Sequence, residues 1–146
     1  MKPAFDPHRR ELLVRIWRER VGLGANPDEV LVSAQDLFLG NADHGSIGCN
    51  FSAHPGVETF ASILTTVQER RDVQDVLVGI TDVNNDAGDS WPFSGRVYII
   101  SSASVAEVKD WVQPLSPDDV VEVAGHEPLL RNYRMFDPAT KVYLVW

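Results

Sequence analysis

Apolar residues recur every three or four positions in two parts of the chain, which predicts two amphipathic helices. The first helix begins at Pro55 and ends in the charged cluster that starts at Glu69. The second begins at Ser104, because Ser104 and Glu107 have the spacing of a capping box. The first should bury Val57, Phe60, Ala61, Leu64 and Val67, and the second Val105, Val108, Trp111, Val112 and Leu115.

Shorter apolar runs predict strands. Ile47, Cys49 and Phe51 alternate with polar residues, which is typical of a strand with one buried face. Residues 76–81 and 97–100 are apolar at both alternating sets of positions, so we expect two central strands that are covered on both faces. Further strands are predicted at residues 30–32, 120–123 and 141–146, and one helical turn is predicted after Ser33.

The order of these elements predicts an α+β fold and one domain over residues 1–146. From Ser46 to Val123 the order is β-α-β-β-α-β, the ferredoxin-like arrangement, in which helices cover one face of an antiparallel sheet. The C-terminal strand and an N-terminal helix entered at Asp6-Pro7 are additions, which we expect to cover the other face. The apolar stripe of that N-terminal helix consists of Leu13, Ile16, Trp17 and Val21.

Composition narrows the class of protein. No apolar run approaches the ~18 residues that span a bilayer, and the N-terminus enters a charged helix instead of an apolar signal region. Cys49 is the single cysteine, which excludes an intrachain disulfide and fits a reducing compartment. We therefore expect a cytoplasmic protein with no membrane partner.

The charge of the chain is unevenly distributed. The formal net charge is −8, yet residues 9–20 contain five arginines and two glutamates, so the rest of the chain carries −11. An acidic body repels the phosphates of nucleic acids and attracts a basic protein. We interpret the arginine stretch as a solvated helix face rather than a nucleic-acid contact.

A polar cluster between residues 41 and 54 contains the thiol of Cys49 near two imidazoles. A histidine can hold a cysteine as a reactive thiolate, but Cys49 alternates in phase with core residues, so we interpret it as structural. His44, Cys49 and His54 lack the close ligand pairs of zinc sites, so no metal is predicted there. Four residues of this cluster form the alternative candidate site: Asn41, His44, Asn50 and His54.

A second candidate site lies in the connection between the two central strands. Its aspartates alternate as in a calcium loop, but neither the glycine nor the final glutamate of such a loop is in place. Aromatic residues beside an acidic loop can anchor a partner, although they can also fold back onto the sheet. The candidate binding residues are Asp82, Asp86, Asp89, Trp91 and Phe93.

Five short segments stand out along the chain: GN at residues 40–41, GSIGCN at 45–50, HPG at 54–56, DVQDVLV at 72–78 and WPFS at 91–94. Together they resemble a widespread family of small, uncharacterised bacterial proteins. The resemblance covers about residues 30 to 123, and the C-terminal tail departs from it. It implies a bacterial cytoplasmic protein and brings no established activity or catalytic residues.

These observations favour a non-enzymatic protein that binds a basic protein partner, such as an immunity protein or an inhibitor of a toxin. No nucleotide-binding, hydrolase or metalloprotease motif occurs, so no catalytic residue and no cofactor are predicted. Two alternatives stay open: a self-associating structural domain that forms a homodimer through its sheet, and a small-ligand enzyme that uses the residue 41–54 cluster.

Overall fold

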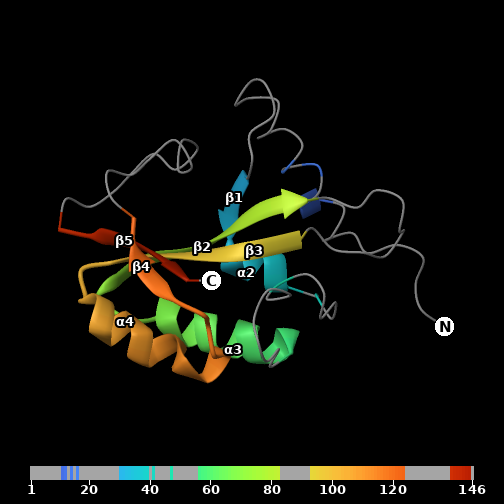
Figure 1. The fold of residues 1–146 in the computed structure, drawn as a ribbon. Helices are drawn as coiled ribbons and strands as arrows, with labels where there is room; N and C mark the ends of the chain where they lie inside the picture. The colour runs from blue at the N-terminus through green and yellow to red at the C-terminus, as the bar shows by residue number, and fades with distance from the viewer. Residues whose placement is uncertain are drawn as a thin grey trace.

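The computed structural model describes residues 11, 12, 14, 16, 30–39, 41, 47, 56–82, 93–123 and 139–145. Within them a five-stranded antiparallel sheet has the order β1-β2-β3-β5-β4, and helices α3 and α4 lie against one face of it (Figure 1). The α+β prediction is therefore confirmed. The strands are β1 Val30–Ser33, β2 Val73–Asp82, β3 Phe93–Ser101, β4 Val120–Glu122 and β5 Lys141–Val145; the helices are α2 Ala34–Phe38, α3 Val57–Gln68, α4 Val105–Val112 and the 3-10 turn η2 Gln113–Leu115.

Helix α3 forms where the apolar period predicts it. Gly56 precedes the helix at φ 99°, a left-handed backbone angle that glycine adopts without a steric penalty. The carbonyl of Gly56 accepts the amides of Thr59 and Phe60, at 3.1 and 3.2 Å. Four of the five predicted core residues, Val57, Phe60, Leu64 and Val67, are buried, whereas Ala61 is half-buried.

Helix α4 begins at the predicted cap. The backbone amide of Glu107 donates to the Ser104 hydroxyl at 3.2 Å, which satisfies one free amide of the first turn. Val108, Val112 and Leu115 are buried as predicted, and Trp111 is partly buried. Val105 was expected in the core but is 38% exposed; it lies in the first turn, at the N-terminal end of the apolar stripe.

Both faces of the sheet are buried at its centre. On the helix side, Val76 and Val78 of β2 pack with Phe60 and Leu64 of α3, and all four are fully buried. On the other side a second cluster is formed by Leu31, Leu77, Tyr98, Ile100 and Val142. The predicted two-sided cover of the central strands is confirmed, and each large side chain buried in this way contributes roughly 1.5–3 kcal/mol.

Strand β5 corrects one expectation. Instead of crossing the other face of the sheet, the C-terminal strand lies inside it, between β3 and β4. Its residues explain this position, because Val142 is buried on one face while Tyr143 and Val145 are buried on the other. Strands with two buried faces belong in the interior of a sheet.

The N-terminal helix is described at four positions, all helical. Leu12 and Ile16 are buried in the cluster that contains α3 and α4, so this part of the helix does not cover the second face as we expected. Ile16 belongs to the predicted stripe, but Leu12 does not. The other stripe residues, Leu13, Trp17 and Val21, lie outside the described residues.

The ferredoxin-like order stays a prediction. Its first strand, expected at residues 46–51, lies outside the described residues except for Ile47, which is buried and forms an isolated β-bridge. The short strand predicted at 30–32 and its helical turn are confirmed as β1 and α2. In the part of the chain that the structure describes, no helix has both the length and the apolar character of a membrane span.

Hydrogen bonds at the β3–α4 turn fix the start of α4. The Ser101 hydroxyl donates to the Asp72 carbonyl at 2.5 Å and accepts the amide of Ala103 at 3.0 Å. The Ala103 carbonyl accepts the hydroxyl of Tyr143 in β5, at 2.5 Å. These bonds join the α3–β2 turn, β3 and β5. They therefore fix the start of α4 relative to β5 and to β4, the edge strand beside it.

Candidate functional site

The hairpin candidate is described only at its base. Asp82 at the end of β2 stands opposite Phe93 at the start of β3, so the hairpin brings these two backbone positions together. Asp86, Asp89 and Trp91 lie outside the described residues. The predicted binding loop therefore has a defined origin in the sheet, and its five residues stay a prediction.

The residue 41–54 cluster is described at two positions. Asn41 is half-buried, and its amide nitrogen donates to the carbonyl of Leu37 at 3.1 Å. This bond satisfies a backbone acceptor at the end of α2, so Asn41 has a structural role there. His44, Asn50, His54 and Cys49 lie outside the described residues.

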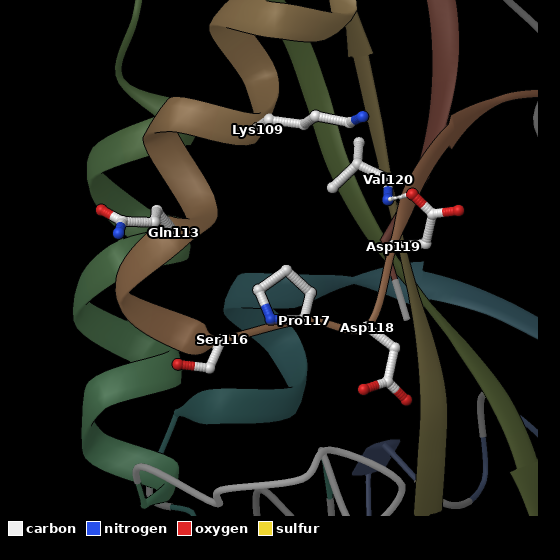
Figure 2. Close-up of a pocket in the computed structure, with 7 residues that line it drawn as sticks. All are labelled: Lys109, Gln113, Ser116, Pro117, Asp118, Asp119 and Val120. Carbon is white, nitrogen blue, oxygen red and sulfur yellow. Dashed lines mark hydrogen bonds between the residues drawn. The ribbon is translucent and has the colours of Figure 1, made fainter.

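A third candidate emerges from the structure: a shallow groove between α4 and β4. Its volume is about 370 Å³, and it is lined by Lys109, Gln113, Ser116, Pro117, Asp118, Asp119 and Val120. Figure 2 shows Lys109 extending from α4 toward β4 at one end of the groove, with Asp118 near the other end. Sequence reasoning did not identify this groove as a site.

The groove exists because the chain turns sharply after η2. Ser116 has φ 53° and ψ 50°, and its amide donates to the Gln113 carbonyl at 2.9 Å. A left-handed backbone costs a residue other than glycine roughly 1–2 kcal/mol, so the surrounding packing must maintain it. Buried Leu115 and Val120 on either side of the turn anchor it to the core, which leaves Pro117 and two aspartates at the surface.

The pairing of β4 with β5 shows which backbone groups of β4 point outward. The Val123 amide donates to the Val142 carbonyl at 2.8 Å, so these two residues form a hydrogen-bonded pair. Such pairs alternate along antiparallel strands, so the backbone groups of Val120 and Glu122 point away from β5. The outward amide of Val120 donates to the Asp119 carboxylate at 2.8 Å (Figure 2).

The segment that forms α4, η2 and β4 is acidic, and two of its carboxylates, Asp118 and Asp119, line the groove. Residues 105–122 contain five carboxylates and one lysine, and all six side chains are exposed. The Nζ atom of Lys141 in β5 lies 3.6 Å from Oε1 of Glu122. This ion pair is exposed, so it offsets little of the negative charge. The carboxylates are Glu107, Asp110, Asp118, Asp119 and Glu122.

Among the described residues, no three His, Cys, Asp or Glu side chains converge as ligands of a metal ion would. The sequence did carry a signal for this surface, namely the excess of acidic residues between 105 and 122. A count of charge in short windows would have found it, although the groove itself depends on the turn at Ser116.

Comparison with known proteins places the chain in a family. The model of the uncharacterised protein YfbO family matches residues 8–145, nearly the whole chain. The chain belongs to the YfbO family. An uncharacterised protein YfbO from Escherichia coli strain K12 is 37% identical over 100 residues, which cover 66% of this chain and 69% of that protein.

The YfbO match confirms the resemblance to small uncharacterised bacterial proteins and extends it. The resemblance seen in the sequence ended near residue 123, whereas the YfbO family match includes β5 and therefore the C-terminal strand. No solved structure matches the chain. Because the family description names no activity, the function must be argued from the surface of the molecule.

Proposed function

We propose that this YfbO-family chain is a non-enzymatic binding protein that recognises a basic protein through the acidic surface of α4 and β4. One observation carries the proposal: residues 105–122 contain five exposed carboxylates and a single lysine, and two of these carboxylates, Asp118 and Asp119, line a shallow groove. An immunity protein or an inhibitor of a basic toxin would use such a surface. The aspartates of the hairpin, Asp82, Asp86 and Asp89, are a second surface that the same partner could contact.

Exposed carboxylates act mainly on the rate of association. Like charges that face solvent create a potential that attracts a basic partner before contact, and salt screens this potential within about 8–10 Å at physiological ionic strength. The affinity should therefore fall steeply as salt is added. A site based on apolar contact would be much less sensitive to salt.

Affinity capture with paired variants tests the proposal. The immobilised native chain should retain a basic protein from a bacterial lysate at about 50 mM salt and release it as salt screens the charges. The variant Glu107→Gln/Asp110→Asn should retain less of that protein, because it removes two charges from α4.

The control variant Glu58→Gln/Glu69→Gln removes two exposed charges from the α3 segment instead, with Glu58 and Glu107 each in the first turn of its helix. It should retain as much partner as the native chain. A third variant with Asp82, Asp86 and Asp89 neutralised reports on the hairpin. Failure of the native chain to retain any basic protein would contradict the proposed function.

A further inference from the structure

Strand β4 is the last strand of the sheet, and in the described part of the chain it pairs only with β5. Its outward groups are those of Val120 and Glu122, as the alternation of hydrogen-bonded pairs shows. The Asp119 carboxylate accepts the Val120 amide, and among the described residues the outward amide of Glu122 and the outward carbonyls of Val120 and Glu122 have no strand beside them. This edge can accept the backbone of an added strand.

The side chains of β4 are arranged to receive such a strand. Val120 faces the helix side of the sheet and is buried, whereas Val121 points to the other face and is 38% exposed. Side chains of a strand alternate between faces, so an added strand would present every second residue to the α4–β4 groove. The remaining side chains would lie beside Val121.

From these observations we infer that the β4 edge and the α4–β4 groove bind an extended, lysine- or arginine-bearing segment of the partner protein as a sixth strand. The inference rests on the proposed function and names how the partner is held. Backbone hydrogen bonds to β4 supply the pairing, and the surrounding carboxylates select a basic segment.

The charge of the edge decides between possible occupants. Carboxylates stand at both ends of β4, with Asp119 just before the strand and Glu122 at its last position. Natural sheets use such charges to prevent unwanted pairing at edges. A second copy of this chain that paired through its own β4 would bring the same carboxylates and be repelled. A basic segment is attracted by these charges, so the same carboxylates that repel acidic strands favour a strand that carries lysine or arginine.

Fluorescence anisotropy with a labelled peptide tests the inference. The probe is a peptide of about ten residues with alternating lysine and valine, long enough to form a strand. It should bind the native chain at about 50 mM salt. The double variant Asp118→Asn/Asp119→Asn should weaken binding by about tenfold or more, and the control Glu58→Gln/Glu69→Gln by less than about twofold.

A second pair of variants isolates the backbone pairing from the charge. Proline at position 122 removes the outward amide without breaking a bond to β5, and proline is tolerated at such edge positions. Glu122→Pro should therefore weaken binding by about tenfold more than Glu122→Gln, which loses the same charge and keeps the amide. A peptide of the same charge with methylated backbone nitrogens should bind about tenfold more weakly as well.

The outcomes that overturn the inference differ from those that overturn the proposed function. If the α3 and groove variants weaken peptide binding equally, or if the methylated peptide binds as tightly as the unmethylated one, the attraction is one of general charge. Either result would contradict strand addition but not the proposed function. A dimer in sedimentation equilibrium that the Glu122→Pro variant dissociates would assign the edge to a second copy. Absence of binding to both the peptide and every basic protein would contradict the proposed function.

Discussion

Ser101 is the buried polar residue among the described residues, and its hydroxyl has two partners. It donates to the Asp72 carbonyl and accepts the Ala103 amide, so it joins two turns that lie 29 residues apart in the chain. The Asp72 carbonyl also accepts the amide of Ser102 at 3.0 Å, so removing the Ser101 hydroxyl leaves the buried amide of Ala103 as the group without its bond. The cost of an unsatisfied buried group is about 1–3 kcal/mol.

The variant Ser101→Ala should therefore lower the free energy of unfolding by about 1–3 kcal/mol, measured by urea denaturation. The neighbouring Ser102 provides a control, because its hydroxyl is exposed and lies 3.5 Å from the same carbonyl. Ser102→Ala should change the free energy of unfolding by less than about 0.5 kcal/mol. Equal effects of the two variants would contradict the role given to Ser101.

Tyr143 should make stability depend on alkaline pH. Burial raises its pKa above the usual 10.0; the carboxylates of Glu122 and Glu107 add to this, while Lys141 opposes it. Because the pKa of Tyr143 is higher in the folded state, the contribution of its neutral phenol to stability is fully present below pH 10.0. This contribution is lost as the pH rises through the pKa of the folded state. The hydroxyl also donates to Ala103, a bond worth about 1 kcal/mol at neutral pH.

The variant Tyr143→Phe should thus be less stable than the native chain at neutral pH. The difference in free energy of unfolding should shrink above pH 10.0, where only the native chain must bury an ionising phenol. Denaturation at a series of pH values measures this difference. A difference that stays constant across the alkaline range would contradict the assignment.

At the scale of the element, the two serine N-caps of the described helices can be compared. Ser104 caps α4 with its hydroxyl, whereas Ser33 stands at the same position of α2 and makes no side-chain cap bond. Ser104→Ala should cost about 0.5–2 kcal/mol of unfolding free energy, and Ser33→Ala less. Thermal unfolding followed by circular dichroism measures both, and a larger loss for Ser33→Ala would contradict the capping role of Ser104.

Local pattern predicted the helices and most strands of the fold. The apolar period of α3 and the cap of α4 depend on residues a few positions apart, so the sequence alone contains them. Strand β2 begins at Val73, three residues before the predicted start. The prediction missed these residues because polar Gln74 and Asp75 interrupt the apolar run. The Asp75 carboxylate accepts the amide of Val76 at 2.8 Å, where the pairing with β3 is irregular.

The order of the strands and the groove depend on contacts between distant parts of the chain. Nothing near β5 in the sequence shows that it pairs with β3 and β4, since this depends on which surfaces need cover. The groove needs the left-handed turn at Ser116, a conformation that a serine adopts only when its surroundings require it. Neither feature has a local signature.

At the scale of the whole molecule, the two ends of the sheet differ in character. The end formed by β1 continues directly into α2 (Figure 1). The end formed by β4 carries the groove, the outward backbone groups and the exposed carboxylates. Binding of a basic segment should therefore be confined to the β4 end. Five of the 21 acidic residues of the chain thereby have a location at this end of the fold.

Chemical-shift mapping tests this location most directly. The isotope-labelled native chain is titrated with the lysine–valine peptide, and backbone amides are followed one by one. We predict that the amide of Glu122, which points away from β5, shifts and becomes protected from hydrogen exchange, while Val30–Ser33 of β1 stays unchanged. Amide shifts confined to β1 would contradict this location of the site. Amide shifts spread evenly over the residues of α3 and α4 that carry exposed carboxylates would contradict it as well.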